Sequence, residues 1–353
     1  MNIIKIQEQL DSNRRSVAFD SYDITLKQLY DMVLEGMVDI APEYQRHFVW
    51  DSNRQSALIE SLFLGIPIPS LFMASNRDAS WEVIDGLQRL TTILNFIGND
   101  NELEKISIKH EQLKLSGLEK LDSMNGLIYG DLPKSMQFML QTRPLRITVL
   151  NDRSDFTVRY DLFERLNTGG VTLHEQEIRN CVYIGPFNDF IKDLSENHDF
   201  RAVVKMTANA ERSGSYEELV LRFFAYHEDA EQFVHSVKGF LNEFMEKKTE
   251  SFKDKESKEL RKVFQNTFKV LRDNLPDGIV RGARKNITPV VLYEAISVGC
   301  ALAIGSGEIY APEKLAALLN NPEVKKCTTG ATNSKKMVLK RINIVKDTLV
   351  NGV

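Results

Sequence analysis

The stretch that decides the fold of the N-terminal half is WEVIDGLQRLTT, residues 81–92. Residues 81–84 are mostly apolar and predict a buried strand, and Asp85-Gly86 predicts a turn. A helix is expected from about Leu87 to Ile97, ending at a Gly-Asn-Asp turn. A glycine turn that leads from a strand onto a helix leaves the first N–H groups of the helix without intrahelical partners. Together with the helix dipole, these groups favour an anion such as phosphate.

Side chains in this stretch suit phosphate chemistry. Gly86 is expected to let a ligand approach the backbone closely, because glycine has no Cβ. Gln88 and Arg89 supply donors, and arginine binds phosphate in a bidentate manner. Thr91 and Thr92 add hydroxyl groups in the first turn of the helix. These residues are the candidate phosphate ligands.

Asp85 has several possible roles in such a site. Its carboxylate can hold a metal-bound water, orient Arg89, or only cap the helix, which aspartate commonly does. In a purely structural interpretation, Asp85 is the N-cap and Arg89 is a surface residue. The residues alone leave both interpretations open.

A second segment, residues 40–50 or IAPEYQRHFVW, places polar residues between aromatic ones. A functional interpretation makes Arg46 a contact to phosphate or base, with Gln45 beside it. Tyr44 or Trp50 would then frame the pocket. The alternative is that the aromatic residues are core and Arg46 is solvated, since aromatic residues mostly serve packing.

A third segment, FERLNTGG at residues 163–170, closes a helix expected over 155–166. C-capping explains the glycine pair by itself. Arg165 and Asn167 are candidate nucleotide ligands on the condition that this loop folds beside Arg89.

Length and composition indicate an ordinary globular protein of two domains. The chain has 353 residues, of which 42% are hydrophobic and 27% charged. Three distant cysteines form neither a disulfide framework nor a zinc motif and favour a reducing cytoplasm. The N-terminus lacks the apolar segment of a secretion signal. Residues 290–304 are apolar but too few to cross a bilayer and include Glu294, so a buried helix is expected.

The order of the expected elements predicts an α+β fold in two parts. Strands at 70–74, 81–84 and 145–149 alternate with helices in the first part. After Gly185-Pro186 almost only helices are expected, over about 231–248, 256–274, 289–304 and 335–350. Capping boxes are expected at Thr172-Leu-His-Glu175 and Ser215-Tyr-Glu-Glu218. The prediction is a mixed α/β nucleotide-binding domain over residues 1–185 and an all-helical domain over 186–353.

Missing motifs exclude several enzyme classes. The six histidines form no HxH or HxxxH pair and none follows His235, which argues against an HNH nuclease in the C-terminal half. The sequence has no GxxxxGK[ST] motif of a P-loop, and it has neither GxSxG nor SxxK of the serine hydrolases.

The three segments occur in order, with LGIPIP at 64–69 between the first two and EIRN at 177–180 after the third. In this respect the chain resembles the family named for the N-terminal domain of GmrSD Type IV restriction endonucleases. The resemblance implies a ParB/sulfiredoxin-like fold in which the strand–Gly–x–x–Arg–helix element binds a nucleoside triphosphate. It also implies antiphage restriction of modified DNA, with nucleotide hydrolysis as a switch.

The family's Asp-Gly-Gln-Gln-Arg signature matches Asp85, Gly86, Gln88 and Arg89. Leu87 replaces the usual glutamine at the middle position, a change that bears on base choice or hydrolysis but not on the backbone phosphate cradle. Many members continue into an HNH-like nuclease domain, which the histidines of this chain do not support. The chain therefore resembles a stand-alone GmrS-type subunit with a separate nuclease.

The first hypothesis is an NTP-binding and NTP-hydrolysing subunit of a modification-dependent restriction or antiphage system. In it Gln88 and Arg89 hold the phosphates, Asp85 positions Mg²⁺ or water, and Arg46 closes the site. DNA, a separate nuclease subunit and a second copy of the chain are the expected partners, and a membrane is not.

Two further hypotheses remain. One is a ParB-like module that binds DNA or a partner without hydrolysis. Seven basic residues against two acidic ones follow Asn320, and Lys335, Lys336, Lys340 and Arg341 would contact DNA phosphates. The other is a metal-dependent DNA nickase, for which Asp85 and Glu43 are the candidate carboxylates.

Overall fold

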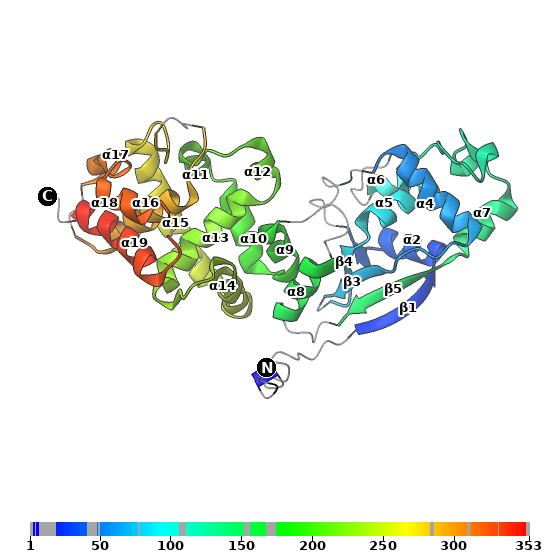
Figure 1. Ribbon diagram of the computed structural model, residues 1–353, viewed down its shortest axis with the longest axis horizontal. Helices are drawn as coiled ribbons and strands as arrows, with labels where there is room; N and C mark the ends of the chain where they lie inside the picture. The colour runs from blue at the N-terminus through cyan, green and yellow to red at the C-terminus, as the bar shows by residue number, and fades with distance from the viewer. Residues whose placement is uncertain are drawn as a thin grey trace. The chain divides into compact units, whose positions relative to one another are not determined.

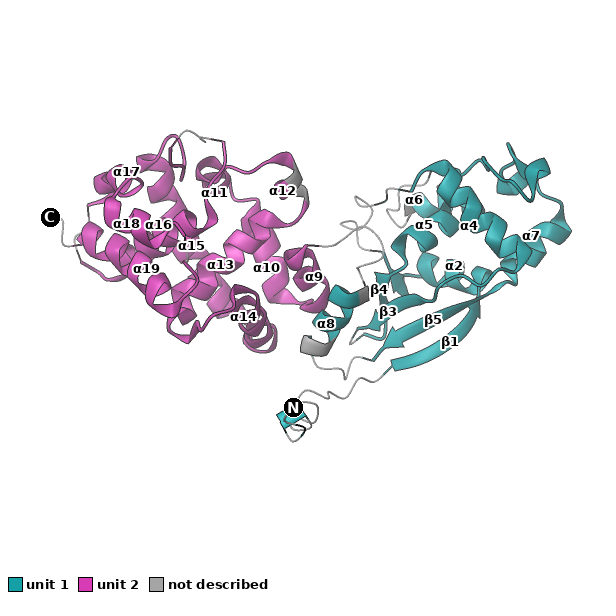
Figure 2. Ribbon diagram, viewed as in Figure 1, with its two compact units in different colours: residues 1–172 teal, residues 173–353 magenta. Residues whose placement is uncertain are grey.

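The structure is a computed structural model, and it divides into two compact units, residues 1–172 and 173–353 (Figures 1 and 2). It describes residues 3, 5–6, 19–40, 48, 50–76, 78–105, 111–151, 156–166, 174–282, 286–308, 311–330 and 332–350. The expected fold class is confirmed: a mixed α/β unit is followed by a helical one.

The first unit is built on a mixed five-stranded sheet of order β1-β5-β3-β4-β2 (Figure 1). Its strands are β1 Phe19–Thr25, β2 Val38–Asp39, β3 Leu71–Ser75, β4 Trp81–Asp85 and β5 Pro144–Leu150. β3 pairs antiparallel with β4 and parallel with β5, while β1 lies antiparallel to β5 at the edge. The expected strands at 70–74, 81–84 and 145–149 correspond to β3, β4 and β5. The sequence analysis did not predict β1, because the strand lies mostly exposed at the edge and shows no apolar alternation.

Helices of the first unit pack on the sheet, and those before residue 142 share one apolar core with it. They are α2 Leu26–Leu34, α4 Ser52–Leu64, α5 Leu87–Ile97, α6 Asp100–Lys105, α7 Lys134–Gln141 and α8 Phe156–Leu166, with short 3-10 helices at Asp122–Met124 and Tyr129–Asp131. The Asp51 carboxylate accepts from the Arg54 N–H at 2.8 Å, and Gly65 ends α4 in the left-handed conformation. Because β3 and β4 are neighbours, the loop before β3 lies beside the turn that follows β4.

The second unit consists of helices. They are α9 Glu175–Val182, α10 Pro186–Ser195, α11 His198–Val203, α12 Ala208–Arg212, α13 Ser215–Asp229, α14 Val237–Ser251, α15 Asp254–Asn274, α16 Val290–Gly305, α17 Leu315–Leu318, α18 Pro322–Cys327 and α19 Lys335–Val350, with 3-10 helices at Ala230–Gln232 and Pro312–Lys314. Most residues of α16 are buried, as expected for its apolar sequence. Gly299 permits the close approach of α19, since a Cβ there would lie 2.6 Å from Val345 Cβ. In the part of the chain that the structure describes, no helix is long and apolar enough to span a bilayer.

The two compact units meet before α9, and the domain limit expected near residue 185 stays a prediction. Arg179 on α9 shows why this helix packs with the second unit. Its fully buried guanidinium donates to Asn242 Oδ1 at 2.8 Å and to Glu218 Oε2 at 3.2 Å, both in the second unit. These partners lie 63 and 39 residues away along the chain, so local sequence patterns do not indicate them.

A chain of buried charges continues from Glu218 through the second unit. Arg222 Nη2 lies 2.7 Å from Glu218 Oε1, and its Nη1 lies 2.8 Å from Glu294 Oε1 on α16. Glu294 in turn pairs with Arg341 on α19, and both side chains are 1% exposed. Burial raises the pKa of Glu218, but the attraction of Arg222 and Arg179 outweighs it, and the pKa is lowered overall. Alternating charges thus connect four helices.

One expected capping box is wrong and the other begins outside the described residues. Ser215 is the first residue of α13 behind a left-handed Gly214, and Glu218 pairs with arginines and not with a cap. Thr172 is not described, and α9 begins at an N-cap His174 whose N–H donates to Glu177 Oε2 at 2.7 Å. In α13, the tertiary contact of Glu218 with Arg179 engages the side chain that the local sequence assigned to a cap.

Candidate functional site

The turn between β4 and α5 leaves the start of α5 open. Gly86 is the N-cap at a φ of 104°, and no side chain of the described residues caps the helix. By contrast, the side chains of Thr25 and Asp51 cap α2 and α4. With no side-chain cap among the described residues, the first turn of α5 has the arrangement that favours an anion at a helix start.

Arg89 holds the turn in place. Its Nη2 donates to Asp85 Oδ2 at 2.6 Å, and its Nη1 donates to the Ser70 carbonyl at 3.0 Å and to the Pro69 carbonyl. The Arg89 side chain is 11% exposed and that of Asp85 36%. The structural alternative is therefore wrong in both parts, because Arg89 is not a surface residue and Asp85 is not the N-cap. Asp85 orients Arg89, one of the roles expected for it.

Gly86 is required by packing. A Cβ at this residue would lie 2.3 Å from Leu71 Cδ2 and 3.2 Å from Arg89 Nη2. Leu71 is completely buried in β3, so it cannot move aside into solvent. The positive φ and this close approach account for the glycine without a ligand.

Gln88 links the turn to the segment around Trp50. Its Oε1 accepts the Trp50 backbone N–H at 3.2 Å. Thr92 is completely buried, and its hydroxyl donates to the Gln88 carbonyl at 2.7 Å. The Thr92 hydroxyl is therefore not available to a ligand, whereas Thr91 is only half-buried.

Most of the other predicted ligands fall outside the part of the chain that the structure describes. Tyr44, Gln45, Arg46 and Asn167 lie outside the described residues. Arg165 is exposed in the last turn of α8. The structure thus brings together Asp85, Gly86, Gln88 and Arg89 with Trp50, and leaves the remaining candidates as predictions.

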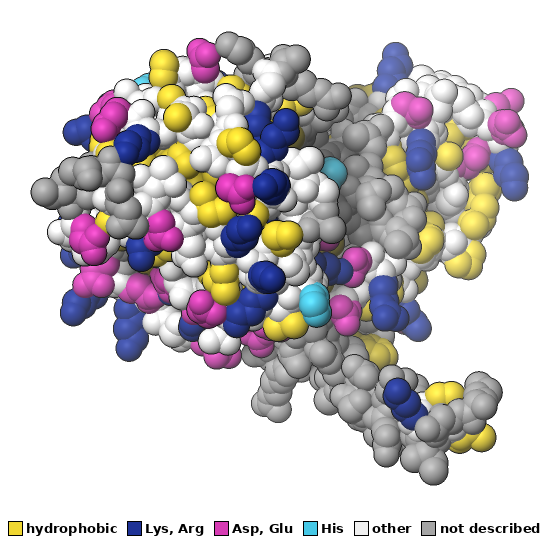
Figure 3. All heavy atoms as spheres, turned by 60° about the vertical axis from the view of Figure 1, so that its left-hand side comes forward, with side chains coloured by type: hydrophobic (Ala, Val, Ile, Leu, Met, Phe, Trp, Pro, Cys, Tyr) yellow, Lys and Arg dark blue, Asp and Glu magenta, His cyan; other side chains and the backbone are white. Residues whose placement is uncertain are grey.

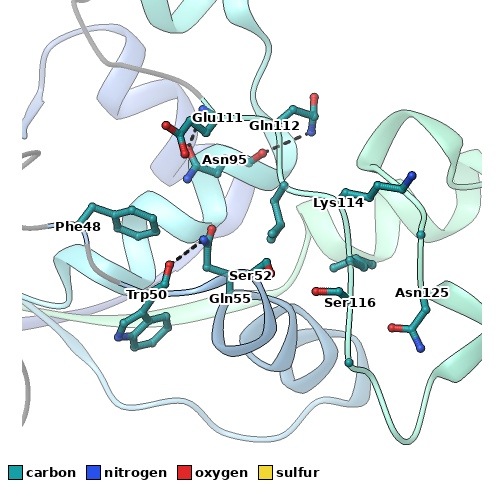
Figure 4. Close-up of a pocket in the computed structure, with 14 residues that line it drawn as sticks. Phe48, Trp50, Ser52, Gln55, Asn95, Glu111, Gln112, Lys114, Ser116 and Asn125 are labelled. Atoms are coloured by element: carbon teal, nitrogen blue, oxygen red, sulfur yellow. Dashed lines mark hydrogen bonds between the residues drawn. The ribbon is translucent and has the colours of Figure 1, made fainter.

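A cavity of about 830 Å³ lies beside α5 (Figure 4). Its lining includes Phe48, Trp50, Gln55, Asn95, Gln112 and Ser116. In Figure 4 the aromatic rings of Phe48 and Trp50 lie toward one end of the cavity, and the amide side chains of Gln55 and Asn95 lie near its middle. The Arg54 guanidinium lies over the Trp50 ring, 4.7 Å from its centroid, and helps to orient it.

Gln55 and Asn95 were not identified in the sequence analysis, although a signal existed. Gln55 precedes Leu58, Ile59 and Leu62 at helical spacing, so it occupies a core-facing position of α4. Asn95 stands within the apolar run of α5. A polar residue on a buried helical face is the feature that would have pointed to this cavity.

Of the four C-terminal basic residues expected to contact DNA, three lie near carboxylates and Lys336 is exposed. Arg341 is completely buried against Glu294, so the expectation that it contacts DNA is wrong. Lys335 lies 3.3 Å from Glu231, and Lys340 lies 3.7 Å from a carboxylate of α18. On the face shown in Figure 3, Lys and Arg side chains are interspersed with Asp, Glu and apolar side chains.

The described residues contain no group of three His, Cys, Asp or Glu side chains that could hold a metal ion. Glu43, the second carboxylate considered for a nickase, is outside them. Cys181, Cys300 and Cys327 are buried free thiols, as their spacing predicted.

Comparison with known proteins finds one family match. Residues 26–184, less than half of the chain, match the family model described as GmrSD restriction endonuclease, N-terminal domain. The matched region contains β3, β4, α5 and the cavity, and it extends to α9 of the second unit.

Other comparisons add little to the GmrSD match. A solved structure described as "Structure of the C2221 form of Pnob8-like ParB-N domain" has a TM-score of 0.22 and 13% identity, over 93% of this chain and 98% of that chain. At that TM-score the likeness carries no argument about the fold. No curated protein matches this chain.

Proposed function

We propose that this protein is the nucleoside-triphosphate-binding and hydrolysing subunit of a modification-dependent restriction or antiphage system. The observation that carries the proposal is the open start of α5, with Arg89 and Asp85 beside it, inside the region that matches the GmrSD N-terminal domain. An anion at this position would receive hydrogen bonds from backbone N–H groups and a favourable field from the helix dipole.

In this proposal Arg89 acts as a fixed positive charge. Two carbonyls and Asp85 already hold its guanidinium, so it is pre-positioned before a ligand arrives. A donor that is held in advance loses little conformational entropy when phosphate binds. Gln88 would transmit the state of the site to the segment around Trp50, because its side chain accepts the Trp50 N–H.

Asp85 is the residue that fits Mg²⁺. Magnesium is commonly held by one or two carboxylates together with substrate phosphates, so a single protein carboxylate is sufficient. Only Oδ2 of Asp85 bonds Arg89 among the described contacts, and the side chain is about one-third exposed. Bound magnesium would neutralise charge on the phosphates, and Asp85 would hold the ion or a water bound to it.

The proposed setting is the cytoplasm, with DNA and a separate nuclease as partners. The buried free cysteines are compatible with a reducing compartment. Hydrolysis would act as the switch that permits or ends the action of the nuclease.

The test compares nucleotide binding and phosphate release in wild type and Arg89→Ala. Loss of a charge-assisted contact of about 1.5–3 kcal/mol predicts an affinity that is at least tenfold weaker. Arg146→Ala is the matched control, because Arg146 also pairs with an aspartate of this sheet but its side chain is exposed. Arg89 also holds the turn through Asp85, so Asp85→Asn is measured in parallel to report on the loss of that contact. Thermal unfolding verifies that each variant is folded. Unchanged binding and hydrolysis in folded Arg89→Ala would reject the site.

Two further assays address the other hypotheses. Binding to DNA without nucleotide, with an affinity that falls steeply with salt, would favour a DNA-binding module without hydrolysis. Cleavage of one strand of a supercoiled plasmid with Mg²⁺ or Mn²⁺ alone would favour a nickase. Under the proposed function, the isolated chain shows phosphate release and no nicking.

A further inference from the structure

The cavity beside α5 contains chemistry that the phosphate site does not explain. Phe48 and Trp50 supply aromatic surface, and Gln55, Asn95 and Gln112 supply amide groups (Figure 4). Its volume of about 830 Å³ lies within the range of roughly 300–1,000 Å³ typical of small-molecule sites. Glu111 and Lys114 also contribute to the lining, but the aromatic rings and the amides together provide a flat apolar surface with uncharged donors and acceptors, which suits a flat heterocycle.

One polar atom at the cavity lacks a partner. Gln55 is 8% exposed, and its Nε2 donates to the Trp50 carbonyl at 3.0 Å. A carbonyl can only accept, so this bond fixes which end of the amide is the nitrogen. The buried Oε1 is therefore an acceptor, and it has no hydrogen-bond partner. A buried acceptor in this state favours any ligand that brings an N–H group to it.

The cavity is connected to the proposed phosphate site. The Trp50 N–H donates to Gln88 Oε1 in the first turn of α5, and the Trp50 carbonyl accepts from Gln55. Asn95 lies seven residues after Gln88 on the same helix, a rise of about 10 Å. One residue, Trp50, thus touches the first turn of α5 and the cavity lining.

We infer that this cavity binds a nucleobase. The base would stack against the aromatic end and donate an amino or imino N–H to Gln55 Oε1. Because this oxygen is closed off from solvent, binding requires a small shift of the Gln55 side chain. The link between this base and a phosphate rests on the proposed function. The base belongs either to a free nucleotide or to a DNA strand from which it is extruded.

Fluorescence of Trp50 provides a direct test. The chain has two tryptophans, Trp50 and Trp81, so Trp81→Phe leaves Trp50 as the reporter. Phenylalanine keeps an aromatic ring in the stack that Trp81 forms with Tyr22 at 5.4 Å. Each NTP, each nucleoside, tripolyphosphate, a single-stranded oligonucleotide and a duplex are titrated separately. We expect at least one base-containing ligand to quench Trp50 strongly through stacking, and tripolyphosphate to produce at most the smaller change that Gln88 transmits from the phosphate site.

Gln55→Leu then tests the base contact. Loss of one hydrogen bond to the base predicts about five- to tenfold weaker binding of the base-containing ligand, with tripolyphosphate affinity by calorimetry unchanged. Gln137→Leu is the matched control, because the Gln137 amide also donates to backbone carbonyls of this unit but does not line the cavity.

The outcomes separate the two proposals. If NTP binds no more tightly than tripolyphosphate and no base-containing ligand depends on Gln55, the base site is rejected while the phosphate site stands. If nucleosides or an oligonucleotide bind in a Gln55-dependent manner and tripolyphosphate does not bind, the base site stands and the phosphate site is rejected. Gln55-dependent binding of oligonucleotide but not of free nucleotide identifies an extruded base as the ligand.

Discussion

Replacement of Gly86 by alanine tests the geometry of the β4–α5 turn with a single methyl group. The backbone φ of 104° disfavours any residue with a Cβ, at a cost of about 1–2 kcal/mol. The new Cβ would also lie 2.3 Å from Cδ2 of Leu71, which is completely buried. Relief of such an overlap typically costs about 1–3 kcal/mol. Gly86→Ala should therefore lower the free energy of unfolding by about 2–5 kcal/mol.

Gly36→Ala isolates the conformational part of this loss. Gly36 has a φ of 73°, and a Cβ there would meet nothing within 4 Å. The free energy of unfolding of the Gly36→Ala variant should therefore fall by only about 1–2 kcal/mol. Both tryptophans lie in the first unit, so urea unfolding followed by their fluorescence reports on this unit alone.

A double-mutant cycle with Leu71→Ala completes the test. Removing the leucine side chain opens space for the new methyl group, so the double variant should be more stable than the sum of the two single losses predicts. The expected coupling is about 1–3 kcal/mol. If Gly86→Ala costs no more than Gly36→Ala, or the cycle shows no coupling, the turn does not have the close packing described.

Three further predictions concern the second unit. Arg341→Met should lower the free energy of unfolding by about 3–5 kcal/mol, because Glu294 loses one of its two buried partners. Circular dichroism in guanidinium measures this loss. Lys326→Ala breaks an exposed pair and should cost less than about 1 kcal/mol, so equal losses in the two variants would contradict the buried network. Acid should destabilise this unit through Glu218, because the pKa of this side chain in the folded protein is lowered below its ordinary value of 4.5. Its contribution to the free energy of unfolding is complete at a pH above 4.5 and is lost as the pH falls through the folded pKa. Unfolding curves at several pH values between 7 and 3 should show a smaller acid dependence in Glu218→Gln, and an identical dependence would refute this assignment. Burial raises the pKa of Cys300 to about 12, and all three cysteines are buried. A thiol reagent should therefore label the native protein slowly, and it should label three thiols after denaturation. Rapid labelling of the native protein would contradict the packing.

Local patterns were sufficient for the elements around the candidate site. Apolar runs predicted β3 and β4, and the Asp-Gly turn and helical periodicity predicted α5. The same reasoning missed β1, because an exposed edge strand carries no apolar alternation. It also gave no sign that α9 packs against the second unit, because the partners of Arg179 lie on helices far along the chain.

For the site itself, the sequence by itself determined which residues stand at the β4–α5 turn and that α5 begins after a glycine. Only the tertiary structure decided what those residues contact. Arg89 binds carbonyls 19 and 20 residues away because the sheet order places β3 beside β4. The cavity likewise requires α4, α5 and residues 111–117 to meet. Hydrogen-bond partners and cavities depend on which segments become neighbours, and periodicity along a single segment contains no information on that choice.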